Sequence, residues 1–414
     1  MADFHQNGQV ATLHDLRSVS PEALTHAVAT FVRDRPVTLI LPSLYSELEG
    51  EALPRILDEI AQVPYLRRVV IGLDQADAAQ YAEAVRFFER LPQEHVVIWN
   101  DSPRQRALGD RLKAHGLYPS EPGKGKNVWT CMGYMLARRD TWVAAIHDCD
   151  ILTYSRHMLT RLIYPVVNPN FSYQVSKGFY PRLGDGKMNG RVTRLLVSPL
   201  LVALRVVVGD RDFVDFLRSF RYPLSGEVAL RTATLPDLRI PSDWGLEIGV
   251  LSEAWRNLAP KSICQVEISD AYDHKHQALS PEDAATGLNR MSTDICKAIF
   301  RKLAADGTVF TQNTFRTLKA VYYRTALDML ESYYNDAAMN GLTMDRHKEE
   351  QSVELFAENI MRAGQAFLDN PFETPFIPTW SRVNAADPEL LGDMVAAVEA
   401  DLAEARGTSC RSQS

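Results

Sequence analysis

Short apolar runs alternate with helical segments through the first 150 residues of the chain. Each run ends in polar or turn-forming residues, as buried parallel strands do. The four runs are PVTLILPSL at 36–44, LRRVVIGLD at 66–74, HVVIWND at 95–101 and TWVAAIHDCDI at 141–151. The segments between them show the apolar spacing of amphipathic helices. This alternation predicts an α/β domain with a mostly parallel, doubly wound, Rossmann-like sheet.

Polar residues gather at the ends of these predicted strands. In doubly wound sheets, ligands bind beyond the carboxyl ends of the strands. We therefore expect a binding site at that edge of the sheet. The residues expected there are Pro42, Ser43, Asp74, Asn100, Asp101, Asp148 and Asp150.

The last strand ends in HDCD, which places Asp148 and Asp150 on one side of an extended segment and Cys149 on the other. Two carboxylates on one side repel each other unless a cation or hydrogen-bond donors satisfy them. A divalent cation that bridges to a nucleotide diphosphate would meet this need. A strand end that simply turns into solvent is the alternative.

Two glycine-rich segments carry positive charge. In EPGKGKN, Gly123 and Gly125 allow a close backbone approach, and Lys124 offers a charge to a base or a phosphate. This segment lacks the spacing of a Walker A motif, and an ordinary surface turn is the alternative. In DGKMNGRVTRLL at 185–196, Arg191 and nearby glycines precede an apolar helix. That arrangement suits a phosphate or a carboxylate, although a solvated basic helix start looks the same in sequence.

Further carboxylates and histidines lie beyond residue 220. Glu227, Asp243 and Glu247 stand beside apolar residues and are candidates for a general base, a nucleophile or an acceptor of sugar hydroxyls. Asp243 is also a good helix N-cap. His274 and His276 fall on one face of an extended segment, where two imidazoles suit a metal ion or a phosphate.

The pattern changes at about residue 285, where long amphipathic helical segments replace the strand signals. An aromatic and aliphatic stripe in this part is expected to form core or oligomer contacts. The stripe comprises Tyr322, Tyr323, Leu327, Leu330, Tyr333 and Tyr334. We expect the last ten residues to be a frayed tail.

Composition narrows the classes of protein that fit. The net charge of -7 argues against a general nucleic-acid binder. Five scattered cysteines without CxxC spacing argue against a disulfide framework and fit a reducing compartment. The first residues lack the pattern of a secretory signal, and no apolar stretch has the length of a membrane span. We expect a cytoplasmic protein that acts without membrane or nucleic acid.

The order of these motifs carries a resemblance. An LPxL strand end, GKG, DxD, FYPR, NGRVTRLLVSPLL, PLSGE, WGLEIGVL and a histidine segment follow one another along the chain. This series resembles the retaining glucosyl-3-phosphoglycerate synthases, which are nucleotide-sugar glycosyltransferases of the GT-A fold. Through SDWG it is more distantly similar to mannosylglycerate synthase. The resemblance covers about residues 36–285.

The resemblance implies an activity and a division of the chain. The activity is metal-dependent transfer of glucose, with retention, from UDP-glucose to 3-phosphoglycerate. A GT-A domain would occupy residues 1–285, with a nucleotide-binding part at about 36–150 and an acceptor part at about 151–285. Beyond the part that the resemblance covers, we expect a helical C-terminal extension at 286–414 that forms a homodimer.

The resemblance also implies roles for individual residues. Pro42, Ser43, Leu44, Asp74, Lys124, Asp148, Cys149 and Asp150 would bind the donor. Asp150 and His274 would hold Mg²⁺ or Mn²⁺. Gly190, Arg191, Val192, Thr193 and His276 would bind the acceptor, with Arg191 at its phosphate. Glu227, Asp243 and Glu247 are the catalytic candidates, and Glu227 would lie under the sugar.

Three positions depart from the family pattern. Ser46 stands where a carboxylate is usual, Tyr272 replaces an arginine two residues before the metal histidine, and His276 replaces an asparagine. These departures leave two alternatives open. One is a mannosyl- or glucosyltransferase that uses free glycerate, and the other is a catalytically silent nucleotide-sugar-binding protein.

Overall fold

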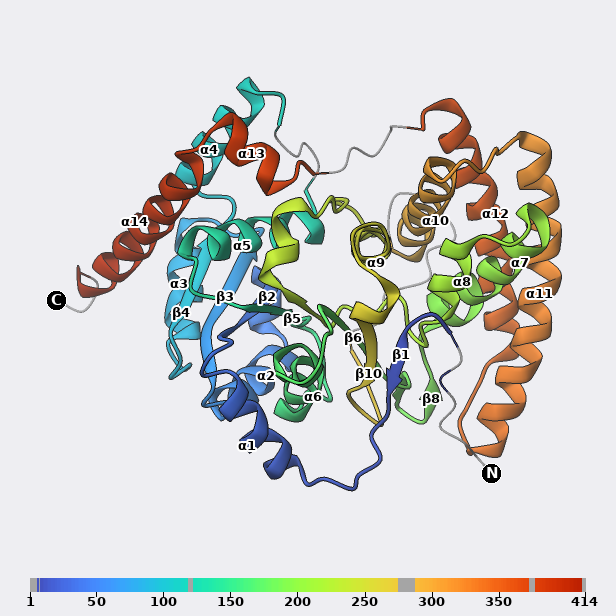
Figure 1. Ribbon diagram of the computed structural model, residues 1–414, viewed down its shortest axis with the longest axis horizontal. Coiled ribbons are helices and arrows are strands. Elements are labelled where there is room, and N and C mark those ends of the chain that lie inside the picture. Colours follow the sequence, from blue (N-terminus) through green and yellow to red (C-terminus); the bar gives the residue numbers. More distant parts are fainter. Residues whose placement is uncertain (1–5, 7, 118–121, 275–286, 372–376, 412–414) are drawn as a thin grey trace.

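A central eight-stranded sheet organises the molecule. The computed structural model describes residues 6, 8–117, 122–274, 287–371 and 377–411 (Figure 1). The strands are β1 (Ala11–Leu13), β2 (Val37–Leu44), β3 (Leu66–Asp74), β4 (His95–Trp99), β5 (Val143–Ile146), β6 (Val175–Phe179), β9 (Val228–Arg231) and β10 (Ile263–Glu267). A separate two-stranded ribbon consists of β7 (Leu183–Gly184) and β8 (Lys187–Met188).

The helices of the sheet-forming part are α1 (Pro21–Phe31), α2 (Ala52–Ala61), α3 (Ala78–Phe88), α4 (Pro103–Ala114), α5 (Lys124–Arg138), α6 (Arg156–Val167), α7 (Ser198–Val208), α8 (Asp212–Arg218) and α9 (Leu246–Asn257). Those of the C-terminal part are α10 (Gly287–Ala305), α11 (Gln312–Met339), α12 (Arg346–Asp369), α13 (Trp380–Ala386) and α14 (Leu390–Arg411). No helix in these described ranges has the length and apolar character that crossing a membrane requires.

The strand order is β1-β10-β6-β9-β5-β2-β3-β4. Neighbouring strands are parallel except at β9, which is antiparallel to both β5 and β6. The predicted mostly parallel sheet is therefore confirmed. The antiparallel strand was not expected from the strand–helix alternation. It brings the segment that precedes it, which includes Glu227, to the middle of the sheet edge.

The two faces of the sheet bury separate apolar clusters. Along β2, Leu39 and Leu41 point into a cluster formed with α1, α2, α3 and α6, whereas Ile40 points to the opposite face. On that opposite face lie α5, α7, α8 and α9, together with apolar residues of the C-terminal helices. Both faces are covered, which explains why the strands are continuous apolar runs rather than alternating ones.

The C-terminal helices contact the rest of the chain in two places. Helices α10, α11 and α12 pack beside α7 and α9, whereas α13 and α14 return to the opposite side of the molecule and pack on α3, α4 and α5 (Figure 1). Tyr322 and Leu330 are buried, which confirms the core interpretation for that part of the stripe. Tyr323 and Tyr334 remain exposed.

The last segment is fixed by aromatic and ionic contacts. The rings of Trp129 in α5 and Trp380 in α13 stack with centroids 4.0 Å apart. Arg111 of α4 pairs with Asp387 at 2.7 Å. Helix α14 continues to Arg411, inside the stretch expected to fray, since its alanine- and glutamate-rich sequence favours helix.

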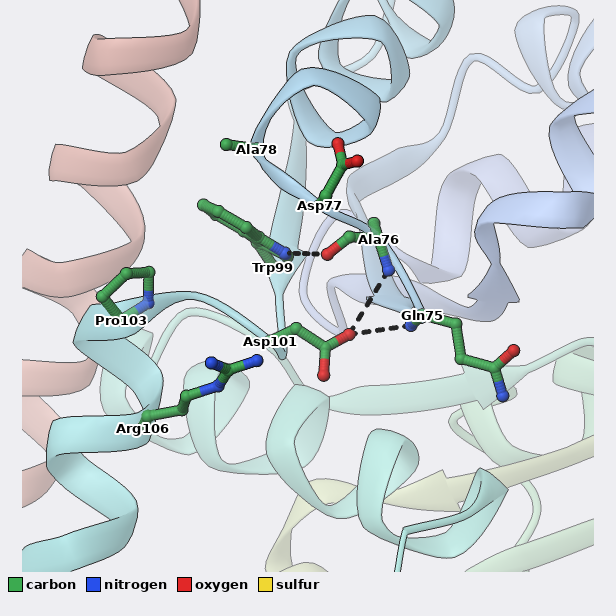
Figure 2. A pocket seen from close by; sticks show the side chains of 8 residues that line it. All are labelled: Gln75, Ala76, Asp77, Ala78, Trp99, Asp101, Pro103 and Arg106. Carbon is green, nitrogen blue, oxygen red and sulfur yellow. Dashed lines mark hydrogen bonds between the residues drawn. The ribbon is translucent and has the colours of Figure 1, made fainter.

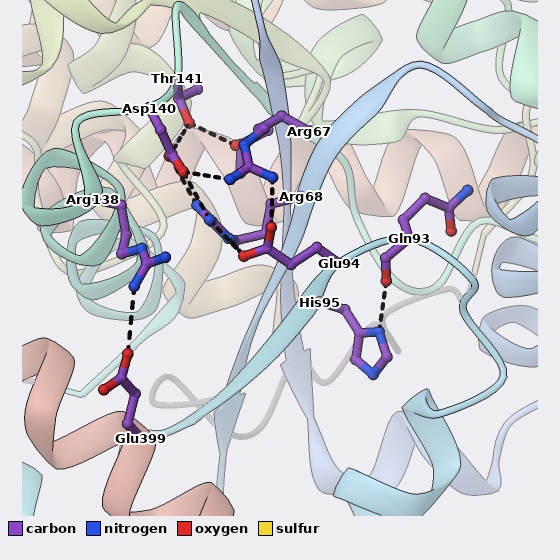
Figure 3. Close-up of polar contacts among 10 residues, drawn as sticks. Arg67, Arg68, Gln93, Glu94, His95, Arg138, Asp140, Thr141 and Glu399 are labelled. Atoms are coloured by element: carbon purple, nitrogen blue, oxygen red, sulfur yellow. Dashed lines mark hydrogen bonds and ion pairs between the residues drawn. The ribbon is translucent and has the colours of Figure 1, made fainter.

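A network of ion pairs links the amino ends of β3, β4 and β5 (Figure 3). Arg68, at the start of β3, is 1% exposed and donates to Glu94 at 2.6 Å and to Asp140 at 2.8 Å. Arg67 binds the same two carboxylates from the outer side. Glu94 directly precedes β4, and Asp140 lies shortly before β5. The network therefore ties together neighbouring strands at the edge opposite the predicted site.

Candidate active site

Lys124 links two of the predicted carboxylates at the carboxyl edge of the sheet. Its Nζ lies 2.6 Å from Asp148 Oδ1 and 3.1 Å from Glu247 Oε1. Lys124 begins α5, and Glu247 lies in the first turn of α9. Burial by itself would lower the pKa of Lys124, but the two carboxylates outweigh burial and raise it. This lysine is therefore a fixed cation between two acidic groups.

The glycines around Lys124 are needed for close backbone packing. A Cβ atom at Gly123 would lie 2.3 Å from the carbonyl oxygen of Ser242, and one at Gly125 would lie 2.0 Å from that of Pro241. Gly123 also has a φ of +153°, which disfavours other residues. The GKG segment is thus packed against the 241–242 backbone, and the surface-turn alternative is wrong.

The two aspartates of the HDCD segment bind different partners. Strand β5 ends at Ile146, so Asp148 and Asp150 follow the strand rather than belonging to it. Asp148 is directed at Lys124, whereas Asp150 Oδ2 lies 3.3 Å from His274 Nδ1. The intervening Cys149 is buried in the apolar cluster of one sheet face, as expected for a side chain pointing the other way.

The pKa values of these two carboxyl groups shift in opposite directions. Burial raises the pKa of Asp148 to about 6, with Lys124 opposing the change. For Asp150, burial also raises the pKa, but the hydrogen bond and the charge of His274 outweigh it, and the pKa falls below its usual value. Of these two carboxyl groups, Asp150 therefore ionises at the lower pH, and carboxylates bind metal ions in the ionised form.

Asp150 and His274 fit a site for Mg²⁺ or Mn²⁺ with few protein ligands. A bridge between Ile151 and His274 aligns the two segments. Within the described part of the chain, no group of three or more histidine, cysteine or acidic side chains has metal-binding geometry. These ions commonly take one or two side chains and complete their coordination with water and substrate phosphates. The pair fits such an ion and not an all-protein cage.

Glu227 is completely buried and held by three hydroxyl groups. Tyr180 donates to its Oε2 at 2.6 Å, Ser225 to the same oxygen at 3.0 Å and Tyr272 to Oε1 at 2.9 Å. The rings of the two tyrosines stack 3.6 Å apart. Burial raises the pKa of Glu227, but His147 and these hydroxyls outweigh burial and lower it. A carboxylate with three donors is a weak nucleophile.

Two more buried groups lie near Glu227, and neither was singled out in the sequence. Lys177 donates to the carbonyl oxygen of Ser225, and burial lowers the pKa of this lysine to about 8. His147 is completely buried, and neither ring nitrogen has a hydrogen-bond partner among the described residues. Burial lowers the pKa of His147 to about 4, so this side chain is neutral at pH 7.

The predicted acceptor loop forms the start of a π-helical turn, Val192–Val197, that leads into α7. Gly190 has a φ of +76° and packs against the Arg182 side chain. Val192 and Thr193 are buried. Arg191 Nε donates to Glu349 of α12 at 2.7 Å, a contact that no sequence signal pointed to. π-Helical turns of this kind are frequent at functional sites.

Several buried polar atoms of this loop lack hydrogen-bond partners within the described residues. The set consists of Arg182 Nε, Asn189 Nδ2, Thr193 Oγ1 and Arg194 Nη1. Each of these groups can donate a hydrogen bond. Unsatisfied buried donors are uncommon in native proteins, so a cluster of them indicates a place for an anion or another acceptor group.

The remaining donor candidates lie where β2 and β3 end side by side. Leu44 is in register with Asp74 across the two parallel strands, Ser43 is buried and Leu44 is 36% exposed. Asp74 accepts a hydrogen bond from Asn100 at 2.7 Å. Burial raises the pKa of Asp74 to about 6. Pro42, which precedes these residues in β2, belongs to the same strand end.

Two predicted residues do not join this cluster in the described structure. Asp243 accepts from the backbone of Gly245 at 2.9 Å, and its charged neighbours are Lys297 and Arg301 of α10. Burial raises the pKa of Asp243. The structure therefore places this carboxylate at the α9–α10 contact, in the turn before α9. It does not cap that helix, whose N-cap is Gly245. His276 lies outside the described residues.

A shallow hollow of about 430 Å³ opens beside the ends of β3 and β4 (Figure 2). Trp99 and Arg106 line it, and Asp101 accepts from the backbone N–H of Gln75 at 2.8 Å. Of the residues expected at the strand ends, only Asp101 lines this hollow in the described structure. Glu227, Glu247 and the candidate metal ligands Asp150 and His274 do not line this hollow.

The fold matches that of known nucleotide-sugar enzymes. Mannosyl-3-phosphoglycerate synthase from Rubrobacter xylanophilus superposes with a TM-score of 0.53 at 18% identity, over 73% of this chain and 83% of that chain. Glucosyl-3-phosphoglycerate synthase from Mycobacterium tuberculosis, in complex with Mn²⁺, UDP-glucose and phosphoglyceric acid, gives 0.51 at 22% identity, over 71% and 88%. At these identities the likeness establishes the fold. The fold is that of the GT-A glycosyltransferases.

Sequence relatives define the family. The chain is 42% identical to glucosyl-3-phosphoglycerate synthase from Persephonella marina, over 97% of this chain and 99% of that protein. It is 35% identical to the enzyme of the same name from Methanococcoides burtonii, over 97% and 98%. No family model matches the chain. The chain belongs to the glucosyl-3-phosphoglycerate synthase family.

Proposed function

We propose that this protein transfers glucose from UDP-glucose to the hydroxyl of 3-phosphoglycerate, with retention of configuration and with Mg²⁺ or Mn²⁺ as cofactor. The observation that carries the proposal is identity of 42% over nearly the whole length of a relative with that name. The contacts among Lys124, Asp148, Asp150 and His274 support it, because these groups suit a metal-bound nucleotide diphosphate.

The donor is assigned to the ends of β2, β3 and β5. Leu44 and Pro42 flank the uracil, and Asp74 accepts from the ribose. Lys124 and Asp148 bind the nucleotide as an ion pair, while the backbone around Ser43 and Cys149 encloses it. Asp150 and His274 hold the metal ion, which offsets the charge that develops on the departing UDP.

The acceptor is assigned to the loop before α7. Gly190, Val192 and Thr193 offer backbone and hydroxyl donors to the phosphate, and Arg191 adds a positive charge. His276 completes this group of candidates. Asn189 Nδ2 and Arg182 Nε are buried donors without partners among the described residues, and they are further candidates for hydrogen bonds to the acceptor.

The chemistry proposed for this geometry is attack on the same face as the leaving group. The acceptor hydroxyl oxygen forms a bond with the anomeric carbon as the bond from that carbon to the diphosphate oxygen breaks. The hydroxyl proton passes to the departing phosphate oxygen, so UDP and glucosyl-3-phosphoglycerate are the products. Glu227 is assigned as a fixed acceptor of a sugar hydroxyl, because a carboxylate has about four acceptor positions and its three donors leave one of them. Glu247 fixes Lys124 from α9.

The test is UDP release by the purified protein. UDP-glucose or GDP-sugars are paired with 3-phosphoglycerate or glycerate, in Mg²⁺, Mn²⁺ or EDTA. Turnover with UDP-glucose and 3-phosphoglycerate that stops in EDTA is expected. Turnover with free glycerate alone would contradict the assigned phosphate role of Arg191. Binding of UDP without turnover for any pair would favour a silent binding protein.

Three broader expectations belong to the same proposal. They are a cytoplasmic location, a homodimer formed through the helical extension, and a boundary near residue 285 between the transferase domain and that extension. Exposed Tyr323 and Tyr334 on α11 are a surface that such a dimer can cover. Light scattering of the purified protein, alone and with both residues changed to serine, tests the dimer.

A further inference from the structure

A single carboxylate of the helical extension binds two arginines of the acceptor loop. Glu349 Oε1 accepts from Arg191 Nε at 2.7 Å, and Oε2 accepts from Arg194 Nη2 at 2.9 Å. The Glu349 side chain is only 5% exposed. Each oxygen thus holds one arginine in a charge-assisted hydrogen bond, in a place where solvent screens little.

Arg191 and Arg194 differ in burial and in the number of hydrogen bonds that they donate. Arg194 is buried and also donates to the carbonyl oxygens of Met188 and Asn189, so it ties the loop backbone to Glu349. Arg191 is more open, with 36% of its side chain exposed. In the described structure its bond to Glu349 uses Nε alone, which leaves the two Nη groups of a planar guanidinium for an outside anion.

Helices α11 and α12 bring further contacts to the same loop. The Tyr333 ring of α11 lies 5.1 Å from the Arg194 guanidinium carbon, and Tyr322 donates to the Leu195 carbonyl in the π-helical turn. Thr343, between these helices, donates its N–H to the Gly186 carbonyl at 2.8 Å. The extension therefore forms one wall of the acceptor loop and supplies its buried negative charge.

We propose that Glu349 is a positioning residue for the acceptor, holding Arg191 by Nε so that its Nη edge faces the phosphate of 3-phosphoglycerate. This inference rests on the proposed function for the identity of the acceptor. The acceptor site would then contain residues of both parts of the chain, with Arg191 from the sheet-forming part and Glu349 from the helical extension. Glu349 itself touches arginine and not substrate.

The chemistry of the two arginines supports this assignment. Without Glu349, two adjacent guanidinium groups would repel each other, and Arg191 would lose the contact that fixes its orientation. One carboxylate between two cations leaves a net positive charge for an incoming anion. An arginine held by one edge loses less side-chain freedom when the other edge binds a ligand, which strengthens binding.

The experiment compares Glu349→Gln with the wild-type chain by steady-state kinetics in both substrates. We expect KM for 3-phosphoglycerate to rise about tenfold, the size of one charge-assisted hydrogen bond, with kcat and KM for UDP-glucose within about twofold. The matched control is Glu350→Gln, because Glu350 is the next residue of α12 and pairs only with Arg346 in the described structure. Its parameters should not change.

Two further variants keep the test decisive. Glu349→Asp retains the buried charge, and so protects the fold, but its shorter side chain cannot span both arginines and should give the same selective rise in KM. In a double-mutant cycle, Glu349→Gln should add little to Arg191→Ala, since it acts through that arginine.

An unchanged or lower KM for 3-phosphoglycerate in both Glu349 variants would overturn the inference while leaving the proposed function intact. Full additivity with Arg191→Ala would overturn it as well. If the wild-type chain does not turn over, the proposed function fails on its own. Calorimetric binding of 3-phosphoglycerate in the presence of UDP and Mn²⁺ then tests Glu349 directly, and equal affinity in wild type and Glu349→Gln would reject it.

Discussion

Two groups of polar residues lie at or near opposite edges of the same sheet and differ in how completely their hydrogen bonds are satisfied. At the amino edge, Arg68 donates through Nε, Nη1 and Nη2 to Glu94 and Asp140 (Figure 3). At the carboxyl edge and the nearby acceptor loop, His147 and Thr193 keep buried polar atoms without partners in the described structure.

This difference in hydrogen bonding is the one expected between a structural network and a binding site. A buried charge with all its partners in place fixes strand positions and has no capacity left for a ligand. Buried groups without partners cost free energy in the empty protein and are tolerated where a ligand satisfies them. Changes at the amino edge should therefore alter stability, and changes at the carboxyl edge should alter activity.

The largest effect is expected for Asp150→Asn. The amide cannot replace the carboxylate that pairs with His274, so metal binding and stabilisation of the departing UDP are both weakened. We expect kcat to fall on the order of 10³-fold, with little change in the thermal unfolding midpoint. The control is Asp101→Asn at the same sheet edge, which should keep kcat within a fewfold. An active, metal-dependent Asp150→Asn variant would contradict the metal assignment.

Arg68→Ala should show the opposite behaviour. It removes the buried partner of Glu94 and Asp140, but these carboxylates are partly exposed and keep Arg67. We therefore expect a loss of about 2 kcal/mol of unfolding free energy, below the value for a fully buried pair. Chemical denaturation measures this loss, and the variant should keep near-normal kcat where it remains folded. The matched control is Arg67→Ala, because Arg67 binds the same carboxylates but is 41% exposed, and such pairs contribute at most about 1 kcal/mol. Equal losses from the two variants would argue against a buried network.

The sequence predicted the ends of β2 and β3 well, because burial leaves a clear apolar pattern, but β5 ends at Ile146 and not at Ile151. Strand β3 has the predicted bounds, and Asp148, Asp150 and Lys124 meet at the expected edge. The glycines of GKG also carried a real signal, since close backbone packing requires them. Local signals made Asp243 both a catalytic and an N-cap candidate, whereas in the structure Gly245 is the N-cap of α9 and Asp243 lies beside basic residues of α10.

Contacts between distant segments were beyond prediction from one sequence. Glu349 is 158 residues from Arg191, and neither the helical pattern of α12 nor the basic loop indicates that the two meet. Tyr272 was noticed only as a departure from the family, whereas in the structure its hydroxyl donates to Glu227. Such pairings depend on how helices and strands pack, which no local motif encodes.

The contribution of Asp74, at the carboxyl edge, to the free energy of unfolding should depend on pH. Burial raises its pKa from 3.8 to about 6, so the folded chain binds more protons than the unfolded chain between these values. Its contribution to stability is therefore present below pH 3.8 and is lost as the pH rises through 6. We expect Asp74→Asn to be more stable than wild type at pH 7, by on the order of 2 kcal/mol, and equal to it near pH 4.

Glu94, at the other edge, should respond with the opposite sign. Burial raises its pKa, but hydrogen bonds and charge from Arg68 outweigh burial and lower it, so its contribution to stability is lost as the pH falls. Urea unfolding at several pH values measures both variants, Asp74→Asn and Glu94→Gln. If their stability differences from wild type follow the same pH trend, the contrast between the edges is wrong.

The smallest effect, and the finest test of the comparison, is expected for Thr193→Val. Valine keeps the shape of threonine and removes a buried hydroxyl that has no hydrogen-bond partner in the described structure. Removing an unsatisfied polar group should leave the unfolding free energy equal or slightly higher. If that hydroxyl binds the acceptor phosphate, KM for 3-phosphoglycerate should rise about fivefold to tenfold while KM for UDP-glucose stays constant.

The control is Thr160→Val in α6, where the hydroxyl bonds with Tyr65 at 2.8 Å. That variant should lose about 1 kcal/mol of stability and keep both KM values. Loss of stability in Thr193→Val without a change in KM would mean that its hydroxyl is structural, and the acceptor loop would then resemble the amino edge.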